Sequence, residues 1–167
     1  MQTKSIINNK LELMSHHASV QVMRHKTTHQ NSLLAAIAFS PGEVISRFTA
    51  AITQSFATYL TVQTGVDTHI TLWPEYLQYI NHSCEPNVFF DTHTMELICL
   101  KPVQAGDELC FFYPSAEWEM AQPFVCNCGS RHCLQLINGA SHLSNETLGR
   151  YRLTDFIQGQ VNQRRPL

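Results

Sequence analysis

Residues 79–87 read YINHSCEPN and lie between two hydrophobic segments of the chain. The stretch brings together an amide, an imidazole, a hydroxyl, a thiol and a second amide, from Asn81, His82, Ser83, Cys84 and Asn87. Reactive and hydrogen-bonding groups at this density are unusual between apolar runs, because a buried polar group needs a partner. The stretch is therefore predicted to form the centre of a site that other parts of the chain complete.

The composition is that of one globular domain. The chain has 167 residues, of which 44% are hydrophobic and 14% charged, which allows a sizeable core and excludes a disordered or coiled-coil chain. The formal net charge is -2, and no basic stripe offers a surface to DNA or RNA. We therefore expect no direct nucleic-acid binding.

The cellular setting follows from what the sequence lacks. No segment approaches the roughly 18 to 20 apolar residues that a membrane span needs, and the N-terminus does not have the pattern of a secretory signal. We expect a cytoplasmic protein without membrane contact, or a nuclear one if the source is eukaryotic. In this reducing setting the 6 cysteines indicate thiols or a metal rather than disulfides. The oligomeric state is left open.

Several short runs have the alternating or β-branched character of strands, with glycine turns between them. These runs are residues 19–24, 44–48, 59–65, 88–90, 95–100 and 108–113. The apolar run at 33–39 is too short to assign to a helix. Because the strands do not alternate with long helices, we predict a mostly β fold with short helices.

Two helices are expected. One short helix follows Trp73, because Pro74 suits a first turn and Tyr76, Tyr79 and Ile80 share one face. A terminal helix is predicted over 144–157, with Ser144 or Asn145 as its cap and Glu146 near its positive end.

The last third of the chain contains the cysteine motif CNCGSRHC. Cys126, Cys128 and Cys133 are spaced C-x-C-x4-C, and Gly129 permits a tight turn between them. Three thiolates this close in a reducing compartment are typical of a zinc site, which needs a fourth ligand to complete its tetrahedron. Four thiolates leave no open position for water, so such a zinc would be structural.

The candidates for the fourth ligand are Cys84, Cys99, Cys110 and His132. Cys99 and Cys110 lie in predicted strands, where a small buried thiol is the simpler interpretation. His132 directly precedes Cys133, which makes chelation by both residues awkward. We favour Cys84 because it lies at the polar turn, and four unrelated thiols are the alternative.

Three segments resemble the SET-domain protein-lysine methyltransferases. INHSCEPN (80–87) matches the family's NHSCxPN motif, GDELCFFY (106–113) resembles its GEELTFDY motif, and CNCGSRHC (126–133) matches the zinc-binding tail after many SET domains. SPGEVI (40–45) resembles a turn near the family's start. The order and spacing of the segments agree, and the resemblance covers roughly residues 19–137.

The resemblance implies a β-clip-like SET fold with a pseudoknot, short helices, and a C-terminal zinc-bound tail and helix. The segment that ends at Tyr113 would pass beneath a loop near the NHSC residues. The implied division of the chain is an N-terminal arm at 1–17, a SET domain at 18–120, a post-SET zinc-binding segment at 121–140 and a C-terminal helix or tail at 141–167.

The same resemblance implies a small stand-alone enzyme. S-adenosyl-L-methionine would donate the methyl group, and a lysine side chain of a protein or peptide would accept it from the opposite end of a narrow channel. Tyr113 would be the catalytic residue beside the transferring methyl. The implied cofactor contacts are Asn81, His82, Tyr79, Phe124, Leu134 and Ser32. The implied zinc ligands are Cys84, Cys126, Cys128 and Cys133.

The substrate channel is expected to contain Tyr59 and Phe111, whereas Tyr76 and Phe112 are predicted to pack in the core. A lysine amine has a pKa of about 10.4 and must lose a proton before it can attack. A desolvated aromatic channel lowers that pKa, and positioning supplies much of the remaining rate gain. In the family that the sequence resembles, Phe rather than Tyr at the position of Phe111 leaves room around the amine, so the resemblance implies di- or trimethylation.

The sequence departs from the family at several positions. Gln30, Asn31 and Ser32 stand where many members have a Gly-x-Gly turn that approaches the cofactor closely. Gln78, Phe112 and Gln135 also replace residues common in the family. Two alternatives therefore stay open: a catalytically inactive SET fold that binds a peptide, and an N-methyltransferase for a small amine or peptide.

Overall fold

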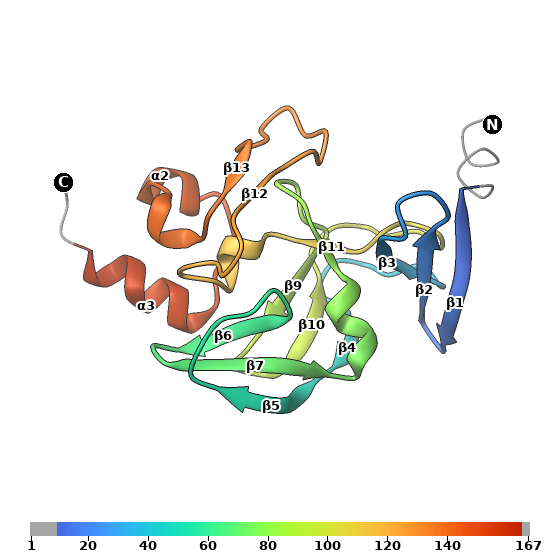
Figure 1. The fold of residues 1–167 in the computed structure, drawn as a ribbon, viewed down its shortest axis with the longest axis horizontal. Coiled ribbons are helices and arrows are strands. Elements are labelled where there is room, and N and C mark those ends of the chain that lie inside the picture. The colour runs from blue at the N-terminus through green and yellow to red at the C-terminus, as the bar shows by residue number, and fades with distance from the viewer. Residues whose placement is uncertain (1–9, 165–167) are drawn as a thin grey trace.

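The computed structural model describes residues 10–164, which form mainly short strands with a few short helices (Figure 1). The sheets have the strand orders β1-β2-β3, β4-β10-β9 and β5-β7-β6, and two further pairs are β11-β8 and β12-β13. This arrangement confirms the predicted mostly β class. The strands are β1 (Leu11–His17), β2 (Val20–His25), β3 (Asn31–Ala35), β4 (Val44–Arg47), β5 (Thr49–Gln54), β6 (Thr61–Gly65), β7 (Thr68–Trp73), β8 (Asn81–His82), β9 (Val88–Asp91), β10 (Glu96–Cys99), β11 (Cys110–Phe111), β12 (Phe124–Val125) and β13 (Leu136–Ile137).

The helices are short. The 3₁₀ helices are η1 (Glu75–Tyr79), η2 (Tyr113–Ser115) and η3 (Ala140–His142), and the α-helices are α2 (Asn145–Leu148) and α3 (Asp155–Gln163). The predicted helix after Pro74 is therefore present as η1. Within residues 10–164, no helix is long and apolar enough to cross a membrane.

The predicted strand runs overlap β2, β4, β6, β9, β10 and β11, and β2 and β9 each extend one residue beyond their runs. Residues 33–39 begin with the end of β3, which pairs with β2 in the interior. Strands β5 and β7 were not predicted. The largely exposed sequence of β5 has no hydrophobic alternation, and its pairing depends on β7. The expected N-terminal arm contains β1, which pairs with β2, while residues 1–9 lie outside the described part.

The predicted continuous helix over 144–157 is wrong. Ser144 caps α2 as expected, accepting a hydrogen bond from the backbone N–H of Thr147, but α2 ends at Leu148. Tyr151 lies in the break, where its ring stacks on that of Phe112 at 3.6 Å. Thr154 then caps the separate helix α3. The stacking of Tyr151 on Phe112 and the second N-cap at Thr154 therefore favour two separate helices over one continuous helix.

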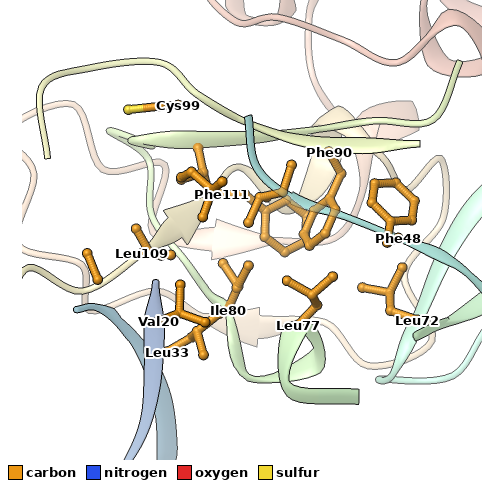
Figure 2. Packing of buried hydrophobic residues seen from close by; sticks show 14 of the residues in the cluster. Val20, Leu33, Phe48, Leu72, Leu77, Ile80, Phe90, Cys99, Leu109 and Phe111 are labelled. Atoms are coloured by element: carbon orange, nitrogen blue, oxygen red, sulfur yellow. The ribbon is translucent and has the colours of Figure 1, made fainter. Parts of the chain in front are cut away.

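The main core lies between the sheets and is rich in aromatic rings. Phe90 meets Phe48 edge to face at 5.4 Å and Phe111 at 4.9 Å, as Figure 2 shows from close by. Leu77 and Ile80, from η1 and its end, fill the space beneath them. The core therefore holds the chain firmly on both sides of the YINHSCEPN stretch.

A second core covers the C-terminal side of the motif GDELCFFY. Phe112, Ala140, Leu148 and Ile157 are all buried there. In Figure 1 the helices α2 and α3 lie on the other side of the central strands from β1, β2 and β3. Phe112, which replaces the family's aspartate, is thus explained by the apolar contacts of this C-terminal cover.

The segment that ends at Tyr113 runs beside the NHSC residues, as the predicted pseudoknot requires. Strand β11 pairs in parallel with β8, two strands that are separated by a hairpin. Asn87 continues this pairing with its side chain. Its Oδ1 accepts from the backbone N–H of Cys110 at 2.8 Å, and its Nδ2 donates to the backbone O of Glu108 at 2.8 Å. The side chain of Asn87 therefore extends the pairing of the two segments beyond β8 and β11.

Candidate active site

A polar cleft opens beside the NHSC residues. Its volume is about 810 Å³, within the range of about 300–1,000 Å³ that is usual for ligand sites. Segments from β3, β8, β11 and the cysteine-rich tail form its walls. Four of the predicted cofactor contacts meet in these walls: Ser32, Asn81, His82 and Phe124.

Asn81 joins two walls of the polar cleft. Its Nδ2 donates to the backbone O of Asn31 at 3.2 Å and to Oε1 of Glu108 at 2.8 Å. Asn31 lies in the segment Gln30 to Ser32, where the family's glycine turn was expected, and all three residues line the cleft. This wall is therefore built from residues with side chains, and Asn81 holds it in place.

His82 connects the polar cleft to the cysteine-rich tail. Its Nδ1 accepts from the backbone N–H of Tyr113 at 3.2 Å, and its Nε2 lies 3.3 Å from Sγ of Cys84. Because Nδ1 is the acceptor, the ring proton of the neutral form is on Nε2, facing the sulfur. Burial lowers the pKa of His82 to about 4, so the ring is neutral near pH 7.

Tyr113 stands between the polar cleft and a second space of about 300 Å³, which we call the aromatic cavity. Its hydroxyl donates to the backbone O of Ile80 at 3.1 Å, which fixes the ring. Burial, with smaller contributions from Cys110 and Glu108, raises the pKa of Tyr113, so the phenol stays protonated. Phe124 also lines both spaces, with its ring 5.9 Å from that of Tyr113.

The aromatic cavity contains both residues predicted for a substrate channel. Tyr59 and Phe111 line it together with Tyr113, and the rings of Phe111 and Tyr113 are 4.6 Å apart. Tyr59 is largely exposed, which places it at the cavity mouth. Glu117 supplies a titratable carboxyl group to this lining, and its position there was not predicted from the sequence. The available signal was an acidic residue within the apolar run FFYPSAEW.

Other predicted residues lie outside both linings. Tyr79 is half-buried against the main core, and Leu134 packs beside the cysteines, where its backbone N–H donates to Sγ of Cys84 at 3.4 Å. Their cofactor contacts stay predictions. Tyr76 packs against the main core and Phe112 is buried in the second core, in agreement with the packing roles expected for both.

The four cysteines expected to bind zinc converge at the end of the polar cleft. Their sulfur atoms all lie within 4.8 Å of one another; the residues are Cys84, Cys126, Cys128 and Cys133. Sulfurs in tetrahedral zinc sites lie at about 2.3 Å from the metal and hence roughly 3.8 Å from each other. The cluster thus suits such an ion after small side-chain adjustments.

The rejected candidates for the fourth ligand lie elsewhere. Cys99 is buried in β10, where its thiol donates to the backbone O of Lys101. Cys110 is only half-buried and lines the polar cleft. The prediction that it is a buried apolar residue is therefore wrong. His132 is exposed and does not belong to the cluster, whose fourth member is Cys84.

The clustered thiols differ in acidity. Burial raises the pKa of Cys84, and it raises that of Cys126 to about 11. Burial acts in the same direction on Cys128, but hydrogen bonds from the backbone and from neighbouring thiols outweigh it and lower its pKa to about 7. The buried thiols of Cys84 and Cys126 keep their protons until a cation replaces them, so the donor set fits a thiolate-binding metal.

Comparison with known proteins agrees with this geometry. The SET domain family profile matches residues 6–114. The chain is 41% identical over 146 residues to methyltransferase flvH of Aspergillus flavus. This alignment covers 86% of this chain and 82% of that protein.

Two further relatives share shorter segments. A SET and MYND domain-containing protein of Dictyostelium discoideum is 35% identical over 66 residues, 34% of this chain and 19% of that protein. An H3 lysine-36 specific histone-lysine N-methyltransferase of Aspergillus oryzae is 34% identical over 83 residues, 42% of this chain and 8% of that protein. The chain thus spans less than a fifth of these two proteins. From the profile match and the likeness to flvH, it belongs to the SET-domain methyltransferase family.

Proposed function

We propose that the protein transfers a methyl group from S-adenosyl-L-methionine to the side-chain amine of a protein lysine. The observation that carries this proposal is the wall formed by Tyr113 and Phe124, which separates the polar cleft from the aromatic cavity. A donor in the cleft and an acceptor in the cavity would meet at this wall. The acceptor class is supported by the histone-lysine methyltransferases among the relatives.

The polar cleft fits the cofactor in size and in chemistry. When bound, S-adenosyl-L-methionine supplies a methyl group on a positively charged sulfur. Asn81 and His82 present polar groups beside the shared wall, and Glu108 adds a carboxylate that suits the cofactor's positive charges. Phe124 offers an aromatic face for the adenine. Residues 30–32 stand in place of the glycine turn, and the cleft that they line has a volume of about 810 Å³.

Tyr113 acts by positioning. Its phenol is protonated and donates to the backbone O of Ile80, so the oxygen's lone pairs are left to orient the acceptor amine at the wall. A phenolate base is excluded near neutral pH by the raised pKa. The apolar side chains around the Tyr113 wall disfavour an ammonium ion there and so favour the neutral, nucleophilic amine at the point of transfer.

The cysteine cluster would hold zinc as a structural ion. Cys84 ends the NHSC stretch, whereas the other three cysteines belong to the tail that carries Phe124. Phe124 and Tyr113 both pack against this cluster. Zinc bound by the four thiolates would therefore fasten the tail to the motif and keep the shared wall in position.

A small amine is the second candidate acceptor. The aromatic cavity has a volume of about 300 Å³, which can accommodate a small ligand without a peptide attached. Methyltransferase flvH, which aligns with most of this chain, has a name that specifies no lysine. Acceptor assays should therefore compare histone H3 peptides with low-molecular-weight amines.

The first experiment is calorimetric binding of S-adenosyl-L-methionine to zinc-loaded protein, with Asn81→Ala as the comparison. We expect binding by the wild type and a clear loss in the variant, because Asn81 holds the cleft wall through Asn31 and Glu108. Circular dichroism and zinc content provide the folding control. No binding by a folded, zinc-loaded wild type would instead favour the peptide-binding alternative.

A further inference from the structure

Glu117 is a buried carboxyl group in the aromatic cavity. Its side chain is 7% exposed and lines the cavity together with Tyr113. Oε1 accepts a hydrogen bond from the backbone N–H of Gln63 at 3.1 Å. Within residues 10–164, Oε2 accepts no hydrogen bond and is not one of the fully enclosed unpaired atoms, and the residue lines the cavity.

Hydrogen bonds of Gln63 and of the neighbouring backbone fix the position of Glu117. Gln63 accepts from the backbone N–H of Trp118 at 2.9 Å and donates to the backbone O of Gly65 at 3.0 Å. On the other side, the backbone N–H of Ala140 donates to the backbone O of Glu117 at 2.9 Å. The carboxyl group is therefore placed by the backbone around it.

Gly139 makes the close approach of the C-terminal segment possible. Its φ is 118°, and a Cβ at this position would lie 2.5 Å from the backbone O of Trp118. Only glycine fits such a contact without a shift of the backbone. The segment after Gly139 thereby reaches Glu117, where the backbone N–H of Ala140 donates to its backbone O.

No cation compensates Glu117 in the described part of the chain. It forms no ion pair there, and the titratable groups that share its cavity are the phenols of Tyr59 and Tyr113. His69 lies opposite Gln63 in the sheet, and burial lowers the pKa of His69, which keeps it neutral near pH 7. An anionic carboxylate in this place is costly unless a ligand brings a positive charge.

The acidity of Glu117 agrees with this arrangement. Burial raises the pKa of Glu117 to about 8, and the hydrogen bond from Gln63 opposes the rise only in part. A carboxyl group with this pKa can exchange a proton with an ammonium ion near physiological pH, because its pKa lies closer to that of the ammonium ion than the pKa of an ordinary carboxyl group does.

We propose that Glu117 binds the acceptor as an ammonium ion and takes its proton, leaving a neutral amine at the Tyr113 wall. This inference rests on the proposed function and names the acceptor class: a cationic amine on an apolar stem, rather than a hydroxyl or thiol. The stem would lie against Leu60, Val62 and Phe111 in the same lining.

The proton and electrons balance as follows. An N–H bond of the ammonium breaks and an O–H bond forms at Oε2 of Glu117, which becomes neutral. The lone pair left on nitrogen forms the bond to the methyl carbon, and the pair of the broken carbon–sulfur bond stays on sulfur. The methylated amine is again a cation, and Glu117 returns its proton to water at the cavity mouth beside Tyr59.

A binding experiment tests the charge preference without any cofactor. Zinc-loaded protein is titrated with n-butylamine and with n-butanol, its uncharged analogue, and binding is followed by NMR between acidic and alkaline pH. We expect the amine to bind more tightly than the alcohol, with affinity that rises through a pH of about 8 as Glu117 ionises. Above about pH 10.4 the amine loses its charge and the preference should disappear.

Glu117→Gln should abolish the preference for the amine. Glu119→Gln is the matched control, because Glu119 is an exposed carboxyl two residues away that interacts with His142 outside the cavity. A Glu117→Gln protein that still prefers the amine, or a wild type that binds both probes equally at every pH, overturns the inference. If Glu117→Gln does not fold, the wild-type pH dependence and Glu117→Asp decide the outcome.

Turnover gives an independent test once an acceptor amine is identified. For a lysine-type amine, kcat/KM of Glu117→Gln should be about 100-fold below wild type near pH 8, because only a small neutral fraction then reacts. The deficit should narrow toward pH 10, which a purely structural defect would not reproduce. Methyl transfer with a pH-independent deficit would leave the proposed function intact and refute the role of Glu117.

Discussion

Replacing Asn87 by alanine should loosen the connection between the NHSC turn and the strand that leads to Tyr113. The side chain of Asn87 makes two hydrogen bonds of 2.8 Å, one to the backbone N–H of Cys110 and one to the backbone O of Glu108. These side-chain bonds add to the two-residue pairing of β8 with β11 and to the backbone bonds from Ser83 to Phe111 and from Asn87 to Cys110. The variant tests whether this asparagine holds the predicted pseudoknot together.

The magnitude follows from the two groups left behind. The N–H of Cys110 is partly buried, so its loss of a partner should cost about 1–3 kcal/mol. The O of Glu108 lies at an exposed residue, where water can replace the amide, and its cost is about 0.5–1.5 kcal/mol. The expected decrease in the free energy of unfolding is therefore about 1.5–4.5 kcal/mol.

Urea unfolding of zinc-loaded wild type and Asn87→Ala measures this decrease by linear extrapolation, provided that the slopes agree. Asn162→Ala is the control, since Asn162 is exposed on α3 and receives one hydrogen bond from Gln158 at 2.9 Å. It should change stability by less than about 0.5 kcal/mol. A loss below about 1 kcal/mol in Asn87→Ala would refute the proposed fastening role.

The other predictions concern the wall, the metal and the buried carboxyl. Tyr113→Phe should strongly reduce methyl transfer, because the phenol oxygen no longer orients the amine, while the circular dichroism spectrum stays that of the folded protein; undiminished turnover would remove Tyr113 from the site. Cys128→Ser should lower both zinc content and cofactor affinity, measured by metal analysis and calorimetry; full cofactor affinity after zinc loss would contradict the tail's role as a wall. Because the pKa of folded Glu117 is raised to about 8, native protein holds a proton that the unfolded chain releases near pH 4.5. Stability from this group should fall as pH rises between these values, and melting curves of Glu117→Gln should lack that fall; identical pH profiles would contradict it.

Local features of the sequence were sufficient for much of the site. Cys126, Cys128 and Cys133 lie within a short segment, so their spacing alone indicated a shared ligand, and Cys84 was chosen because a polar turn presents its thiol. The strand runs were recognisable from period-two hydrophobicity, since burial on one face leaves that pattern. Ser144 was recognised as a helix cap because a serine hydroxyl can accept a hydrogen bond from a backbone N–H of the first helical turn.

Contacts between distant segments explain the errors. The terminal helix is interrupted where Tyr151 stacks on Phe112, a residue far away in the chain, and no helix propensity contains that information. Strand β5 is mostly exposed and is stabilised by pairing with β7, so its own sequence has little strand character. Tyr79 shares a helical face with its neighbours, yet that face turns to the core and not to the polar cleft.

The residue types and their short-range spacing already specified the chemistry available to this protein: four thiols for a metal, a tyrosine at the end of an aromatic strand, and polar groups at one turn. Folding specified which of these groups face the same space. Tyr113 separates two spaces because β11 lies beside β8, and Glu117 enters the aromatic cavity because Gln63, 54 residues away, fixes it there. Spacing along the chain is a local property, whereas a shared cavity depends on the packing of all the segments that enclose it.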